Sequence, residues 1–171
     1  MDFLTGIYVV AAFLGGVGGF ASPELISPGG FGMSLDQPGA VESLIPVGGA
    51  DITEENVTGA SFAGQNLSGA IIVRSNATGA DFSGADLSGA LLDSSNFTGA
   101  DFSRANLADA TINSSNMTGA NFSGACLQGA TIYASNFSES DLTDANLTGA
   151  ELQYSTLDTA VMTGVARDRN C

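Results

Sequence analysis

The side chains that could carry out chemistry are few in this chain of 171 residues. It has 18 acidic residues, four arginines (Arg74, Arg104, Arg167 and Arg169), two cysteines (Cys126 and Cys171), and neither lysine nor histidine. Without histidine, and with two cysteines, the chain offers neither a zinc ligand set nor a Ser-His-Asp triad. No acid-base or nucleophile constellation stands out among the remaining residues. We therefore expect no catalytic residue, no metal, no cofactor and no small-molecule substrate, and hence no enzyme.

The charge of the chain is strongly one-sided. The formal net charge is -14 at pH 7. Contacts to nucleic-acid phosphates need a basic surface, so we expect no nucleic-acid partner. The simplest interpretation of the acidity is a solvated, soluble surface.

Between residues 50 and 164 a hydrophobic residue returns every five positions, without insertion or deletion. This repeat must position the remaining side chains of the segment. A small residue, mostly alanine or serine, stands two positions before each one. A period of five suits neither an α-helix nor a flat strand, whose side chains repeat near 3.6 and 2. The segment must therefore be a repeat architecture. The central residues are Ile52, Val57, Phe62, Leu67, Ile72, Ala77, Phe82, Leu87, Leu92, Phe97, Phe102, Leu107, Ile112, Met117, Phe122, Leu127, Ile132, Phe137, Leu142, Leu147, Leu152, Leu157 and Met162.

A second period, four times as long as the first, lies over it. In one set of units, phenylalanine is the central residue of every fourth unit. In the next set leucine takes this place, and a serine recurs at the same interval. A four-sided coil explains this, because residues four units apart then stack in one column on each side. The recurring sets are Phe62, Phe82, Phe102 and Phe122; Leu67, Leu87, Leu107, Leu127 and Leu147; and Ser75, Ser95, Ser115, Ser135 and Ser155.

This pattern resembles the pentapeptide-repeat family over residues 50–164. The resemblance implies an all-β fold, a right-handed quadrilateral β-helix of about six coils, in which the central residue and the small residue two before it point inward. With coils stacked at about 4.8 Å, the rod would be roughly 28 Å long. Ala77 is the one undersized central residue, and it predicts a small gap in the core or a neighbour that fills it.

The N-terminal segment, residues 1–21, is the most apolar part of the chain. Residues 3–21 (FLTGIYVVAAFLGGVGGFA) carry no charge, and as a helix they would span about 28 Å, close to the hydrocarbon thickness of a bilayer. Gly15 and Gly19 have the spacing that lets membrane helices approach closely. We favour a single transmembrane helix that anchors the protein in the lipid bilayer. The alternatives are a buried cap on the repeats and a secretory signal peptide, although the positive n-region of a signal is missing.

Two short segments flank the repeats. Residues 22–49 hold all four prolines of the chain and many glycines, which predicts a linker that partly caps the open N-terminal end of the coils. Residues 165–171 (VARDRNC) form a polar tail that is too short for a stable helix of its own. Cys126 and Cys171 either form one disulfide or remain free, and two cysteines do not define the redox compartment.

The regular pattern is broken on one side of the predicted square, the side centred on Ile52, Ile72, Leu92, Ile112, Ile132 and Leu152. Apolar and aromatic residues beside an arginine occupy its outward positions, where the other sides carry mostly Asn, Asp, Ser, Thr and Gly. Such a composition is typical of the core of a protein interface. Two occupants fit: a partner protein, or the N-terminal segment of the chain itself. The predicted interface residues are Ile71, Val73, Arg74, Leu91, Tyr133 and Tyr154.

The family resemblance, taken with the apolar N-terminal segment, suggests a function. Pentapeptide-repeat proteins are abundant in cyanobacteria and in the thylakoid lumen. The resemblance therefore implies a membrane-anchored scaffold that docks onto subunits of a larger membrane complex, such as a photosynthetic complex, with the repeats on the lumenal or periplasmic side. The alternative is an acidic DNA mimic that acts on DNA gyrase. Family members of that kind dimerise through a C-terminal helix, which nothing after Gly164 can form.

Overall fold

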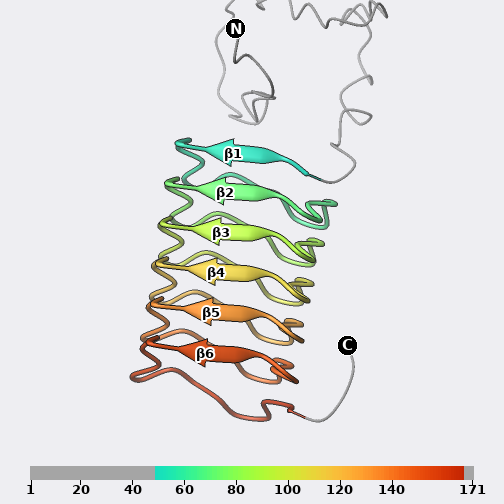
Figure 1. Ribbon diagram of the computed structural model, residues 1–171, viewed down its shortest axis with the longest axis vertical. Coiled ribbons are helices and arrows are strands. Elements are labelled where there is room, and N and C mark those ends of the chain that lie inside the picture. The colour runs from blue at the N-terminus through green and yellow to red at the C-terminus, as the bar shows by residue number, and fades with distance from the viewer. Residues whose placement is uncertain (1–48, 168–171) are drawn as a thin grey trace, which may run out of the picture.

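The computed structural model describes residues 49–167. Within this range the chain is an all-β parallel solenoid, in agreement with the family resemblance (Figure 1). The predicted membrane helix with Gly15 and Gly19, and the predicted cap up to residue 48, lie outside the described residues, as does the tail beyond Arg167. No helix within residues 49–167 is long and apolar enough to cross a membrane.

Six short strands form one parallel sheet in chain order (Figure 1). Each strand pairs with the next at an offset of four five-residue units; Ile72, for example, lies between Ile52 and Leu92. Between Asp51 and Glu151 the chain therefore makes five turns, which link the six rungs. The strands are β1 (Asp51–Thr53), β2 (Ile71–Val73), β3 (Leu91–Asp93), β4 (Thr111–Asn113), β5 (Thr131–Tyr133) and β6 (Glu151–Gln153).

Each turn of the solenoid has four sides. The strands form side 1, and three columns of isolated parallel bridges form the others, with the same offset between partners. The bridge residue directly precedes the central residue on each of these sides. We call them side 2 (bridges from Asn56 to Thr156), side 3 (Ser61 to Val161) and side 4 (Asn66 to Ala166).

Sides 2, 3 and 4 end in tight turns, which explains the glycines of the repeat. On side 4, the N–H of Ala90 donates to the carbonyl of Leu87 at 3.0 Å, and Gly89 between them has φ +63°. A positive φ at the third position is the requirement of a type II turn, and glycine meets it without a steric penalty. On these three sides the five-residue period is therefore a strand position followed by a turn.

The corner after side 1 is closed by serine instead. The hydroxyl of Ser75, which is 4% exposed, donates to the carbonyl of Ile52 at 2.7 Å and accepts the N–H of Glu55 at 3.0 Å. The N–H of Ser75 donates in turn to the Oγ of Ser95 at 2.9 Å. The same bonds repeat along the rod, so that buried serines form a continuous hydrogen-bonded column. Its members are Ser75, Ser95, Ser115 and Ser135.

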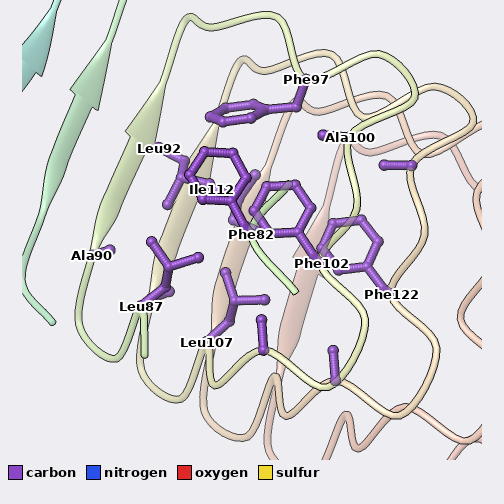
Figure 2. Packing of buried hydrophobic residues seen from close by; sticks show 14 of the residues in the cluster. Phe82, Leu87, Ala90, Leu92, Phe97, Ala100, Phe102, Leu107, Ile112 and Phe122 are labelled. Atoms are coloured by element: carbon purple, nitrogen blue, oxygen red, sulfur yellow. The ribbon is translucent and has the colours of Figure 1, made fainter. Parts of the chain in front are cut away.

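The core consists of inward columns, as the longer period predicted (Figure 2). The rings of Phe62, Phe82, Phe102 and Phe122 stack with 4.9 Å between successive centroids and nearly parallel planes. This distance equals the spacing of neighbouring strands, so each ring belongs to one coil. Ala77 is fully buried, and the ring of Phe97 from the next coil lies 6.0 Å from that of Phe82, which shares a coil with Ala77. The position of the Phe97 ring therefore favours the second expectation, a neighbour that fills the space beside Ala77.

Candidate docking surface

Side 1 differs from the other sides in its backbone. It alone among the described residues forms strands of three residues, and these are rich in β-branched side chains, as in Ile71-Ile72-Val73 and Thr131-Ile132-Tyr133. Such residues favour extended backbone, because their branched side chains pack well on a pleated surface. The middle residue of each strand points into the core, and the residues on either side of it point outward. Side 1 therefore presents two outward columns on a flat parallel sheet.

The first half of side 1 carries an aliphatic cluster. Ile71 and Leu91 are paired in the register between β2 and β3, and they are 41% and 36% exposed. Val73 lies in the other outward column of β2 and is half-buried. Three of the predicted interface residues are thus neighbours on two adjacent strands.

Arg74 borders this aliphatic cluster. Its Nε and one terminal nitrogen both donate to Oε1 of Glu54, at 2.9 and 2.6 Å, across adjacent coils. Both side chains are more than half exposed, so the pair adds little to stability but holds the guanidinium at the corner of side 1. Arg74 has φ +52°, and side chains rather than glycines occupy this corner in every described coil.

The aromatic residues form a second cluster, at the other end of side 1. The rings of Tyr133 and Tyr154 lie edge to face, with their centroids 5.3 Å apart. Tyr133 is 44% exposed and Tyr154 is 81% exposed, so the pair stands out from the sheet. Such aromatic pairs have an apolar body and a polar hydroxyl, a combination that is enriched at protein interfaces.

The six predicted residues do not form one continuous patch. Between Leu91 and Tyr133 lies β4, whose outward residues are Thr111 and Asn113. Asp93 in β3 accepts a hydrogen bond from Asn113, which places a polar bridge between the two clusters. The aliphatic cluster and the aromatic cluster are therefore separate contact points on the same flat side. The interval of four units already places Thr111 between Leu91 and Thr131 in one outward column, so this polar interruption could have been predicted from the sequence.

Sequence reasoning missed one exposed hydrophobic residue, Val161. It is 47% exposed and lies on side 3 in the last described coil. The signal was available in the longer period, because Val161 is the one aliphatic residue in a column of Ser, Asp and Asn. That column is Ser61, Asp81, Asp101, Asn121, Asp141 and Val161.

The polar columns of the other sides bond mainly within themselves. On side 2, Nδ2 of Asn96 donates to Oγ1 of Thr78 in the previous coil at 3.1 Å, and Oγ1 of Thr98 donates to Oδ1 of Asn96 at 2.6 Å. The asparagine column of side 2 thus runs along the rod through threonine, because the amide oxygens of Asn56, Asn76, Asn96 and Asn116 each accept the hydroxyl of the threonine two residues later. Hydrogen bonds within the fold thus explain why polar side chains stand in these columns. By contrast, no residue within the described range covers Ile71, Leu91, Tyr133 or Tyr154.

Two aspartates on side 3 accept hydrogen bonds within their own turns. The pKa of Asp81 lies below its ordinary value because the side chain and the backbone N–H of Ser83 donate to its carboxylate. Thr143 lowers the pKa of Asp141 in the same way. Within residues 49–167, no group of three or more Cys, Asp or Glu residues could hold a metal ion. Asp81 and Asp141 therefore act as acceptors for turn N–H groups, which is a structural role.

Comparison with known proteins agrees with the geometry. The family described as "Pentapeptide repeats (8 copies)" matches residues 49–84, 85–124 and 125–164. A solved pentapeptide-repeat protein from the thylakoid lumen of Arabidopsis thaliana is 35% identical, with a TM-score of 0.56 over 57% of this chain and 68% of that one. QnrB1, a plasmid-mediated fluoroquinolone resistance protein, is 22% identical, with a TM-score of 0.53 over 68% of this chain and 71% of its own, and shares the fold. No curated protein sequence matches the chain.

The family pattern spans most of the chain, and its five-residue units coincide with the sides of the coil. The stacked rings and the in-register strands show the fold that this pattern specifies. The chain therefore belongs to the pentapeptide-repeat family.

Proposed function

We propose that this protein is a non-enzymatic scaffold whose side 1 docks onto a partner protein. It would be an accessory subunit of a larger membrane complex, held at the membrane by residues 3–21. The partner complex we favour is photosynthetic, with the repeats on the lumenal side of the thylakoid membrane.

The observation that carries the proposal is the exposure of large apolar side chains on a flat, rigid side. Ile71 and Leu91 lie side by side, and Tyr133 and Tyr154 stand out from the same sheet. Contacts at the centre of an interface usually come from such aromatic and aliphatic anchors, with polar residues around them. A solenoid side is suited to this role, because its backbone is held by bonds to both neighbouring coils and changes little on binding.

The membrane and the compartment rest on other observations. The apolar, uncharged stretch at residues 3–21 supports an anchor. The 35% identical relative comes from the thylakoid lumen, which supports that compartment. Neither observation depends on the docking surface, so each part can be tested alone.

A fractionation experiment tests the anchor. We expect the full chain, expressed in a photosynthetic host, to stay with the membranes after an alkaline carbonate wash, because peripheral proteins are released by this treatment. A variant with Val9→Arg and Phe13→Arg should be released, since two charges in the apolar stretch oppose insertion. Release of the unchanged chain by carbonate would contradict the anchor.

A charge-insertion experiment tests the docking surface. The double variant Leu91→Glu with Tyr133→Glu places one charge in each cluster, and we expect its binding to the partner complex to fall at least about tenfold. The matched control, Ala63→Glu with Ser123→Glu, adds the same two charges on side 3. Comigration on native gels in mild detergent is the measurement, and circular dichroism checks that both variants fold.

The outcomes separate the candidate functions. Equal loss of comigration in both double variants would mean that net charge, not side 1, governs binding. Full comigration of the Leu91 and Tyr133 variant would overturn the docking surface. An acidic DNA mimic would instead inhibit supercoiling by gyrase, and the substitutions on side 1 would leave that inhibition intact.

A further inference from the structure

The two clusters of side 1 follow one another along the rod. The aliphatic cluster lies on β2 and β3, and the aromatic cluster lies on β5 and at the corner after β6 (Figure 1). With neighbouring strands about 4.8 Å apart, Leu91 lies about 10 Å from the coil of Tyr133, and Ile71 about 19 Å from the coil of Tyr154. Each strand has three residues and is only about 10 Å long. A single element that contacts both clusters must therefore run along the rod, across the strands.

The backbone groups of these strands are already used within the sheet. β2, β3, β4 and β5 each have a paired strand on both edges. The N–H of Leu91 donates to the carbonyl of Ala70 at 2.8 Å, and the N–H of Arg74 donates to the carbonyl of Asp93 at 3.0 Å. An extended partner segment could not add to this sheet, so its own N–H and C=O groups would lack partners in the contact. A helix satisfies its backbone groups internally and makes its contacts through side chains.

The spacing of the two clusters also fits a helix. A helix advances about 5.4 Å per turn, close to the spacing of the coils, and seven residues advance about 10.5 Å, close to two coils. Positions i and i+4 then meet Ile71 and Leu91, and positions i+11 and i+14 meet Tyr133 and Tyr154. All four positions lie on one face of a helix. About 15 residues, or four turns, span both clusters.

The polar strand β4 gives such a contact its register. Thr111 and Asn113 face outward between the clusters, and Asn113 donates a hydrogen bond to Asp93. Position i+7 of the helix meets this strand, so a polar residue is needed there. A helix displaced by one turn would place an apolar side chain on these polar groups, which are then desolvated without new partners.

The charges of side 1 select a cationic partner. The outward columns of β1 to β6 and the corner position after each strand carry four acidic residues, Asp51, Glu54, Asp93 and Glu151, and one arginine, Arg74. This arginine is already paired with Glu54. The described residues as a whole carry 13 acidic residues against three arginines. Such a field attracts basic segments and speeds their association.

We propose that the partner of side 1 presents a basic amphipathic helix of about four turns, which lies along the rod and packs its apolar face on both clusters. This inference rests on the proposed docking of side 1 and adds the class of partner to it. The N-terminal part of this chain does not match the charge pattern, because residues 1–48 carry four acidic residues and neither Lys nor Arg.

Photocrosslinking within the partner complex tests the helix. Benzoylphenylalanine replaces Ile71, Thr111 or Tyr154 in the full chain, one position at a time, and mass spectrometry maps the crosslinked residues. We expect all three positions to reach one partner segment. The sites reached from successive positions should be about seven residues apart, because two coils correspond to about 10 Å. An extended segment covers the same distance in about three residues.

The crosslinks separate the helix from the docking itself. An interval of about three residues would overturn the helix and leave the docking of side 1 in place. Crosslinks from Ser123 on side 3, with none from the three positions on side 1, would overturn the docking. Crosslinks to residues 1–48 of this chain would identify its own N-terminal segment as the occupant and overturn both.

Synthetic peptides test the charge and the pattern. The probe is a peptide of about 18 residues with leucine at i, i+4, i+11 and i+14, glutamine at i+7, and lysine on both flanks of this face. One control has glutamate in place of lysine, and another has the same composition in scrambled order. We expect the lysine peptide to bind the full chain at least about tenfold more tightly than either control, measured by fluorescence anisotropy. Equal binding of the three peptides would overturn the basic amphipathic helix.

A matched pair of variants places the peptide on side 1. Leu91→Thr with Tyr133→Asn gives both positions the residue types that β4 has in the same columns, and it leaves the charge unchanged. We expect this variant to bind the lysine peptide about tenfold more weakly. Val161→Asn removes an exposed apolar side chain from side 3 and should leave the affinity unchanged. Equal affinities of the two variants would overturn side 1 as the binding site of the helix, provided that circular dichroism shows both to be folded.

Discussion

The carboxylate of Asp141 points outward and accepts hydrogen bonds from its own turn. Oδ1 of Asp141 accepts the N–H of Thr143 at 2.8 Å, and the threonine hydroxyl adds a second bond, which lowers the pKa of Asp141 below its ordinary value. Its neighbours in the column are the uncharged Asn121 and Val161. Asn121 makes the same bond to the N–H of Ser123 at 3.0 Å, so an amide can replace the carboxylate here.

Asp141→Asn should therefore reduce the acid sensitivity of the fold. A folded-state pKa below the unfolded value stabilises the fold above pH about 4, and this stabilisation is lost as the pH falls through the folded pKa, because the unfolded chain binds more protons. The asparagine does not titrate, so the variant should lose less stability between pH 7 and pH 3 than the unchanged chain. Urea unfolding midpoints at both pH values provide the measurement. An identical pH dependence would show that this carboxylate contributes nothing.

Ser115→Ala tests the buried serine column. The hydroxyl of Ser115 accepts the N–H of Ser95 at 3.2 Å and donates to the carbonyl of Leu92 at 3.1 Å. Its loss leaves a buried N–H without this acceptor, so the free energy of unfolding should fall by about 1–3 kcal/mol. Ser123→Ala, on the outside of side 3, should change it by less than about 0.5 kcal/mol. Equilibrium unfolding in urea compares the two, and equal effects would contradict a special role for the column.

At the scale of the elements, the aromatic column ties each coil to the next. Phe102 lies between Phe82 and Phe122, with 4.9 Å to each ring (Figure 2). Stacked rings contribute to stability beyond the area that they bury.

Phe102→Ala should lower the free energy of unfolding by about 3–5 kcal/mol, because it removes a fully buried ring and both ring contacts. Phe102→Leu should cost less, about 1–1.5 kcal/mol, since a leucine already occupies this column at Leu142. Denaturant unfolding measures both changes. If the leucine variant were as unstable as the alanine variant, the stacking geometry itself, rather than the filled volume, would hold the coils together.

At the scale of the whole molecule, the rod is a one-dimensional stack. Each strand pairs with the strands one coil before and one coil after it, so every coil contacts only its neighbours. Stability is then a sum of coil terms and interface terms. Whether a deletion removes a whole coil or only part of one should decide whether the stack survives it.

Deletion of residues 91–110 should give a shorter rod that still folds, because Ala90 then precedes Thr111 and every column keeps its register. Deletion of residues 91–95 removes a single side and moves all later residues by one side. That shift brings the serine column and the phenylalanine column out of alignment, so we expect a larger loss of stability from the smaller deletion. Circular dichroism and thermal unfolding compare the two chains. A more stable product from the deletion of the single side would contradict the model of aligned columns.

The two periods in the sequence, one unit and four units long, predicted a four-sided coil with one column on each side, and the family resemblance implied that the central residues point inward. The reason is local: each unit repeats the same backbone path, so Phe102 and Leu107 occupy the same inward place in their units. For Ala77 a gap or a filling neighbour was predicted, and the position of the Phe97 ring, 6.0 Å from the ring of Phe82, favours the neighbour.

Other features were decided only by contacts between coils, which join residues far apart in the chain. The serine column depends on bonds such as that from Ser75 to Ile52, and its part in closing the corner cannot be read from spacing. The hydrogen bond from Asn113 to Asp93, which lies between the aliphatic and the aromatic cluster of side 1, likewise follows only from the stacking of β3 and β4. Spacing along the chain determined which side chains point outward. The stacking of the coils decided how those side chains contact one another, as Tyr133 and Tyr154 do edge to face, because it brings distant residues within about 5 Å.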